Sequence, residues 1–208
     1  MDITKYLSDT STRRVTFEIL PPLKGDSIQK IYDTLDPLME FEPPYINVTY
    51  HREEVVYRTH EGGLLERKVV RKRPGTVAIS AAIKFRYGVE VVPHMICGGF
   101  TKEETENALI DLHFLGIHNV LALRGDMQRN EKSFAPLADG HAHAADLVKQ
   151  IMDMNEGKYL DEELQNPVKT RFVIGVAAYP EKHEEAPNMQ RDLMHLKEKV
   201  DAGAKYII

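Results

Sequence analysis

Short runs of apolar, β-branched and aromatic residues alternate along the chain with stretches whose apolar residues recur every three or four positions. The runs end at proline, glycine or charged residues, as buried strands do, and the spaced stretches are typical of helices with one apolar face. The predicted strands cover residues 15–20, 45–50, 90–95, 119–123, 172–178 and 206–208, and the predicted helices cover residues 28–41, 102–115, 144–154 and 188–202.

The order of these elements predicts a parallel sheet. Strands that alternate with helices pair in parallel, and strands that are apolar on both faces fit either a doubly wound sheet or a barrel. Polar residues follow several of the strands, which is where (β/α)8 barrels carry their chemistry. The first strand also runs into Pro21 and Pro22, where a doubly wound nucleotide fold would have a glycine-rich turn. We therefore expect an α/β fold of the (β/α)8 TIM-barrel type.

The number of strands predicts an incomplete barrel. The 208 residues contain only about six predicted strands, whereas such a barrel has eight. The last predicted strand ends at Ile208, the last residue of the chain. We expect a single barrel domain over residues 1–208 that is truncated at its C-terminal end.

Composition narrows the class of protein. A hydrophobic share of 42%, a charged share of 28% and a net charge of -5 are those of an ordinary globular domain and give no field that attracts nucleic acid. The basic segment 67–74 is interpreted as a solvated insertion. The single cysteine, Cys97, excludes an internal disulfide and favours a reducing compartment. With a polar N-terminus and no long apolar stretch, the chain is expected to be cytoplasmic, with no membrane partner.

Glu18 is the first candidate for chemistry. It stands in an apolar strand just before the proline pair, so at the mouth of a barrel its carboxyl would be desolvated and suited to general acid catalysis near neutral pH. A glutamate on the wet face of an edge strand explains the same pattern, and the strand alone does not decide between the two.

The second candidate is the run Arg124-Gly125-Asp126, which ends a buried strand. Arginine can hold a phosphate by a forked hydrogen bond, glycine lets the backbone approach a ligand, and aspartate can place negative charge beside a developing cation. An Arg–Asp surface pair that caps the strand is the alternative.

Other polar residues at strand ends give weaker signals. Thr49, His94, Tyr179 and His183 each follow or end a strand, and each is also explained by ordinary structural packing. The pair of histidines in the run 141–143 is not interpreted as a metal site, because the run leads into a helix and no third ligand is signalled.

Taken in order, these stretches resemble the methylenetetrahydrofolate reductase family over nearly the whole chain. The residues that carry the resemblance are Thr16-Phe17-Glu18 with Pro21-Pro22, Val48-Thr49-Tyr50, Pro93-His94, Ala122-Leu123-Arg124-Gly125-Asp126, Ala177-Ala178-Tyr179-Pro180-Glu181 with His183, and Lys199-Val200-Asp201-Ala202-Gly203-Ala204.

The resemblance implies a (β/α)8 barrel that binds FAD, takes a hydride from NADH or NADPH, and passes it to methylenetetrahydrofolate by a ping-pong mechanism. It implies that Glu18 is the general acid that opens the folate ring to an iminium ion, and that Asp126 stabilises that cation and contacts the flavin. The positions that match the family's FAD site are Thr49, His94, Arg124, Gly125, Asp126, Ala177, Tyr179, His183, Asp192 and Lys199.

Some features depart from the family pattern, and two other hypotheses compete with it. His143 stands where many relatives carry a tyrosine that contacts FAD, and it is kept as a candidate contact. Part of the family's substrate site would follow Ile208, and the full-length protein is expected to be a homo-oligomer. The rival hypotheses are another FAD-dependent barrel oxidoreductase, such as a proline-dehydrogenase-like protein, and a partial barrel that binds a partner without catalysis.

Overall fold

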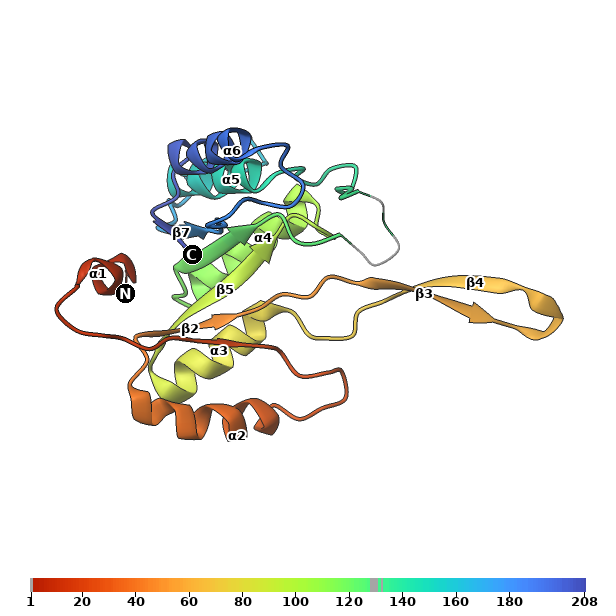
Figure 1. Ribbon diagram of the computed structural model, residues 1–208, viewed down its shortest axis with the longest axis horizontal. Helices are drawn as coiled ribbons and strands as arrows, with labels where there is room; N and C mark the ends of the chain where they lie inside the picture. Colours follow the sequence, from red (N-terminus) through yellow and green to blue (C-terminus); the bar gives the residue numbers. More distant parts are fainter. Residues whose placement is uncertain (1, 128–130, 132) are drawn as a thin grey trace.

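The computed structural model describes residues 2–127, 131 and 133–208, and its centre is a sheet of parallel strands (Figure 1). Along the sheet the strands stand in the order β1-β2-β5-β6-β7-β8, and each pairs in parallel with its neighbours. Their bounds are β1 Phe17–Ile19, β2 Tyr45–Val48, β5 Glu90–Ile96, β6 Asn119–Leu123, β7 Val173–Val176 and β8 Tyr206–Ile207.

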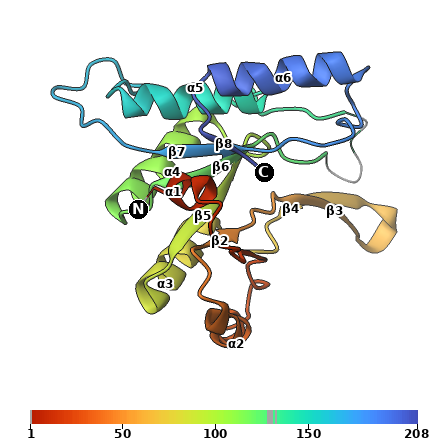
Figure 2. The ribbon, with the colours of Figure 1, turned by 60° about the vertical axis from the view of Figure 1, so that its left-hand side comes forward.

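Apart from the N-terminal α1, the helices connect the strands and cover one face of the sheet, while the sheet itself curls (Figures 1 and 2). The helices are α1 Thr4–Ser8, α2 Gln29–Leu38, α3 Thr76–Tyr87, α4 Lys102–Phe114, α5 Ala144–Asn155 and α6 Met189–Asp201, with short 3-10 turns η1 Met39–Phe41 and η2 Glu61–Gly63. This curled, parallel α/β arrangement is a partial TIM-type barrel, so the predicted fold class and its six strands are confirmed for the described residues. The edges of the sheet are β1 and β8.

Side chains alternate between the two faces of each strand, which divides the apolar residues into two clusters. Ile46 and Val48 face the helices in the main core, which the buried faces of α2 to α5 complete. Tyr45 faces the inside of the curl, where it packs with Leu121 and Tyr206. Ile3, just before α1, closes this inner cluster at the amino ends of the strands, and the carboxyl ends are left for polar residues.

Gly175 allows the inner cluster to close. A β-carbon at this position would lie 2.2 Å from the ring of Tyr206, which crosses β7 and donates from its hydroxyl to the carbonyl oxygen of Val120, 3.2 Å away. Tyr206 is almost fully buried. The missing side chain in β7 is therefore what lets β8 pack against the interior of the curl.

Two regions differ from the predicted elements, and both lie between β2 and β5. Helix α3 is not among the predicted helices, because small residues such as Ser80 and Ala81 weaken the contrast between its apolar and polar positions. The preceding residues form an antiparallel hairpin of β3 Glu54–Thr59 and β4 Leu65–Val70, which projects from the body (Figure 1). The basic segment 67–74 enters this hairpin, and most of it is solvent-exposed or half-exposed, as expected for a solvated insertion.

Within the residues that the structure describes, no helix has both the length and the apolar character needed to cross a bilayer.

Candidate functional site

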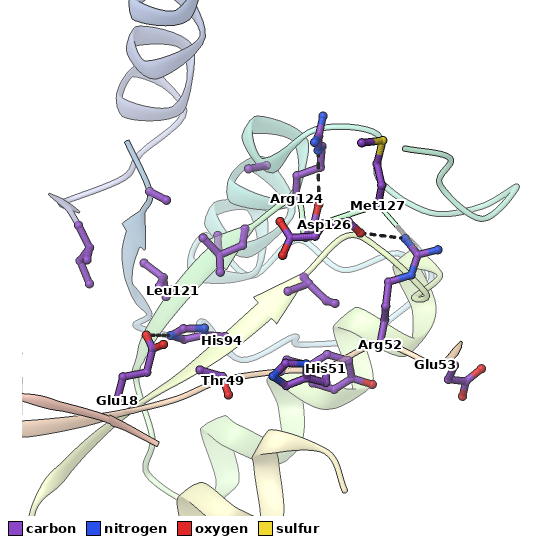
Figure 3. A pocket seen from close by; sticks show the side chains of 18 of the residues that line it. Glu18, Thr49, His51, Arg52, Glu53, His94, Leu121, Arg124, Asp126 and Met127 are labelled. Atoms are coloured by element: carbon purple, nitrogen blue, oxygen red, sulfur yellow. Dashed lines mark hydrogen bonds and ion pairs between the residues drawn. The ribbon is translucent and has the colours of Figure 1, made fainter. Parts of the chain in front are cut away.

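A cavity of about 950 Å³ opens at the carboxyl ends of the strands (Figure 3). Strand exits from β1, β2, β5, β6 and β7 all contribute to its wall, as expected for a barrel of parallel strands. Of the predicted site residues, all except His143 and Asp192 line this cavity. The predicted residues that line it are Glu18, Thr49, His94, Arg124, Gly125, Asp126, Ala177, Tyr179, His183 and Lys199.

Glu18, Thr49 and His94 form one wall. Thr49 ties the end of β2 to β1, because its backbone N–H and its hydroxyl both donate to the carbonyl oxygen of Ile19, at 3.0 and 3.2 Å. Oε2 of Glu18 lies 3.5 Å from Nε2 of His94 (Figure 3). The parallel registers of β1 with β2 and of β2 with β5 therefore bring the carboxyl and the imidazole together at one mouth of the sheet.

The surroundings of Glu18 differ from the expected low-dielectric interior. Its side chain is 56% exposed, whereas the side chain of His94 is 8% exposed. The difference follows from the strand order, since β1 is an edge of the described sheet and has a neighbour on one side only. Glu18 thus combines the two alternatives left open by the sequence, a carboxyl at the cavity that stands on an edge strand.

The imidazole of His94 is neutral near pH 7. Burial and, to a smaller extent, the nearby His51 lower its pKa to about 4. Nε2 of His94 makes no hydrogen bond within the part of the chain that the structure describes. A buried polar nitrogen that faces a cavity is suited to contact a ligand, because an unmade hydrogen bond is costly.

The Arg124-Gly125-Asp126 turn forms the opposite wall. Arg124 does not pair with Asp126, as the surface-pair alternative required, but forks onto the carboxylate of Glu185 at 2.6 and 2.7 Å. This contact lowers the pKa of Glu185. Gly125 has φ +85°, and a β-carbon there would lie 3.4 Å from Cβ of Ile96. The turn needs glycine because residues with a side chain rarely adopt this backbone conformation.

The exit of β7 supplies the third wall. Nζ of Lys199, on α6, donates to the carbonyl oxygen of Ala177 at 2.6 Å, and burial lowers the pKa of this lysine. The rings of Tyr179 and His183 meet edge to face with centroids 5.2 Å apart. Asp192 does not line the cavity; its Oδ2 accepts from the backbone N–H of His183 at 2.9 Å. This hydrogen bond holds the loop that carries His183.

His143 is the other predicted contact that lies outside the cavity wall. It is the exposed N-cap residue of α5, while the next residue, Ala144, lines the cavity. Conversely, the site includes residues that the sequence interpretation missed, among them His51, Arg52 and Lys72 at the base of the hairpin. His51 and Arg52 follow β2 by three and four residues, so the rule that parallel strands carry chemistry at their carboxyl ends could have found them.

The fold and the site together define a TIM-type partial barrel with a polar cavity at the carboxyl ends of its strands. The family model for methylenetetrahydrofolate reductase matches residues 3–208, and the chain belongs to that family. The predicted family resemblance is thereby confirmed, and it favours this family over a proline-dehydrogenase-like one.

Three relatives illustrate the match. The 5,10-methylenetetrahydrofolate reductase of Salmonella typhimurium and the methylenetetrahydrofolate reductase 2 of Saccharomyces cerevisiae are each 32% identical to this chain over 196 residues, 93% of its length. The methylenetetrahydrofolate reductase (NADH) 1 of Arabidopsis thaliana is 29% identical over 217 residues and covers the whole chain. The chain spans 53% of the Salmonella protein, 28% of the yeast protein and 32% of the plant protein.

Proposed function

We propose that the complete protein reduces 5,10-methylenetetrahydrofolate to 5-methyltetrahydrofolate, with electrons from NADH or NADPH passed through bound FAD. The observation that carries the proposal is that Glu18, on β1, and Asp126, in the turn after β6, line one cavity together with the residues that match the family's FAD site. Family membership supports the same reaction. A single cavity that receives the nicotinamide and the folate in turn also agrees with a ping-pong mechanism.

The residues of the cavity fit FAD. The cavity has a volume of about 950 Å³, which is near the upper end of the range for ligand pockets, roughly 300–1,000 Å³. Lys199 and Arg124 are cations suited to a diphosphate, Nε2 of His94 is without a hydrogen bond in the described chain, and Gly125 lets the backbone approach a ring closely. When bound, FAD would accept a hydride from the nicotinamide and deliver it to the folate.

The two acidic residues have different tasks in this proposal. Glu18 is the general acid, which gives a proton to the folate nitrogen whose bond to the one-carbon unit opens. Asp126 faces the cavity from the opposite wall, and its negative charge stabilises the cation that forms. Because His94 is neutral, the ring beside Glu18 carries no positive charge with which the carboxyl could form a salt bridge.

The experiment uses the full-length protein under anaerobic conditions. If the proposal holds, the purified protein has a flavin absorption spectrum, NADH or NADPH bleaches it, and methylenetetrahydrofolate restores it. A well-folded full-length protein that neither carries nor binds FAD would contradict the proposal, and would favour the hypothesis of a non-catalytic barrel. Flavin that is reduced but not reoxidised by the folate would contradict the substrate assignment alone.

We also propose a cytoplasmic location. The single cysteine supports it, since the chain can form no internal disulfide of the kind that secreted domains use. Cell fractionation with an antibody to the full-length protein tests this, and recovery in a secreted or membrane fraction would contradict it.

A further inference from the structure

Arg52 is a largely buried cation at the point where the chain leaves β2 and enters the hairpin. Its side chain is 15% exposed. Nη1 donates to the backbone carbonyl oxygen of Asp126 at 3.3 Å, and Nη2 contacts Oε1 of Glu131 at 2.8 Å (Figure 3 shows the former contact). One side chain therefore holds the segment that carries a proposed catalytic carboxylate.

The hydrogen bonds of the sheet stop just short of Asp126. At the ends of β5 and β6, the backbone N–H of Cys97 donates to the carbonyl oxygen of Leu123, and that of Gly98 donates to the carbonyl oxygen of Arg124, each at 3.1 Å. Gly125 then turns with a positive φ. The contact from Arg52 to Asp126 thus continues the support of this segment beyond the last bond of the parallel sheet.

Packing fixes the guanidinium group of Arg52 in this place. A β-carbon on Gly98 would lie 3.2 Å from Nη1 of Arg52 and 3.2 Å from the ring of Phe134, so the glycine leaves room for both. The guanidinium carbon lies 6.0 Å from the centre of the Phe134 ring, and that of Arg124 lies 4.9 Å from the same ring. Arg52 accordingly joins the exits of β2, β5 and β6.

We propose that Arg52 is a positioning residue: by holding the backbone of Asp126, it keeps the Asp126 carboxylate directed at the cavity. The inference rests on the proposed function of Asp126, and it extends the site to the base of the hairpin. Arg52 itself need not touch the reacting atoms. Its effect on catalysis passes through the geometry of Asp126, because a shift of about 1 Å in a reacting group can cost on the order of a hundredfold in rate.

The test compares three variants of the full-length protein. Arg52→Met keeps the length of the side chain and removes its hydrogen bonds, and Arg52→Lys keeps the charge but loses the fork. Arg58→Met is the matched control, because Arg58 is an exposed arginine on the same hairpin and does not line the cavity.

The first measurement needs neither cofactor nor activity. Amide hydrogen exchange of the flavin-free protein should quicken in residues 124–127 by at least about fivefold in Arg52→Met, less in Arg52→Lys, and remain unchanged in Arg58→Met. Exchange in β5 should stay as in the parent. Unchanged exchange in 124–127, or an equal rise throughout the sheet, would overturn the inference.

The second measurement separates positioning from general stability. In Arg52→Met the reoxidation of reduced flavin by the folate should slow by about ten- to a hundredfold, while reduction by the nicotinamide stays within about threefold of the parent. Arg52→Lys should recover part of the loss. Equal slowing of both half-reactions would overturn the positioning role. If the parent shows no folate reduction, the proposed function fails, and the exchange experiment alone decides whether Arg52 holds the Asp126 segment.

Discussion

The carboxyl of Glu18 and the imidazole of His94 lie 3.5 Å apart at the carboxyl ends of β1 and β5, two strands separated in the sheet by β2. The histidine is buried and the glutamate is exposed. Because burial keeps His94 neutral near pH 7, the contact is that of a carboxyl beside an uncharged ring and not a salt bridge. Several consequences of this arrangement can be measured.

The buried histidine should make the stability of the protein depend on pH. The pKa of His94 is about 4 in the folded chain against an ordinary value of 6.5. Between these pH values the unfolded state binds a proton at His94 that the folded state does not. The free energy of unfolding is therefore unaffected by this group above pH 6.5 and declines as the pH falls from 6.5 to 4. The full decline is about 3 kcal/mol, at roughly 1.36 kcal/mol per pKa unit.

Urea unfolding of the parent and of His94→Gln at several pH values checks this prediction. The stability advantage of the parent over the variant should narrow steadily from pH 7 to pH 4.5. A difference for His94→Gln that stays constant or widens on acidification would contradict the assignment.

The ion pair between Glu185 and Arg124 should compete with an anionic cofactor. Since the guanidinium already forks onto Glu185, a phosphate must displace a carboxylate to reach it. In Glu185→Gln the affinity of the flavin-free protein for FAD should rise by roughly two- to fivefold, in line with the modest energy of partly exposed ion pairs. Fluorescence titration measures it, with Glu184→Gln as the neighbouring control. A weaker affinity would mean that Glu185 helps to form the site.

Gly175 should be intolerant of even one added carbon. The β-carbon of Gly175→Ala would lie 2.2 Å from the Tyr206 ring, so we expect a loss of about 1–3 kcal/mol or more in the free energy of unfolding. Gly75→Ala is the control, because a β-carbon at Gly75 meets nothing within 4 Å; its cost should remain below about 1 kcal/mol. Equal unfolding midpoints for the two variants in thermal melts would refute the packing argument.

The sequence predicted the fold well where the spacing of apolar residues and the residue types at the ends of each run indicate the same element. All six strands of the parallel sheet were predicted, because each is a short apolar run that ends at a proline, a glycine or charged residues. The helix at 76–87 was missed since its small residues weaken the stripe pattern. The hairpin that precedes it was missed because both faces of its strands are largely exposed. Its sequence therefore shows little alternation between apolar and polar residues.

The site was predictable to the extent that strand ends reveal it. Glu18, His94 and Asp126 could be found because each lies at or just after the end of a predicted strand. Arg52 could not, since its partner is a backbone carbonyl oxygen 74 positions away, which leaves no trace in residue types. The pairing of Arg124 with Glu185 was hidden for a similar reason, because it depends on how the loop after β7 folds back.

The most direct test of the central claim is the effect of Glu18→Gln on the two half-reactions of the full-length protein, measured anaerobically by stopped-flow. The glutamine keeps the shape of the side chain but has no acidic proton to give. Flavin reduction by NADH or NADPH should stay near the parent rate, while reoxidation by methylenetetrahydrofolate should fall by about a hundredfold or more, the scale of general acid catalysis. Glu61→Gln, which alters an exposed carboxylate of the hairpin that does not line the cavity, should change neither. Equal slowing of both half-reactions in Glu18→Gln, or an unchanged folate step, would contradict the account.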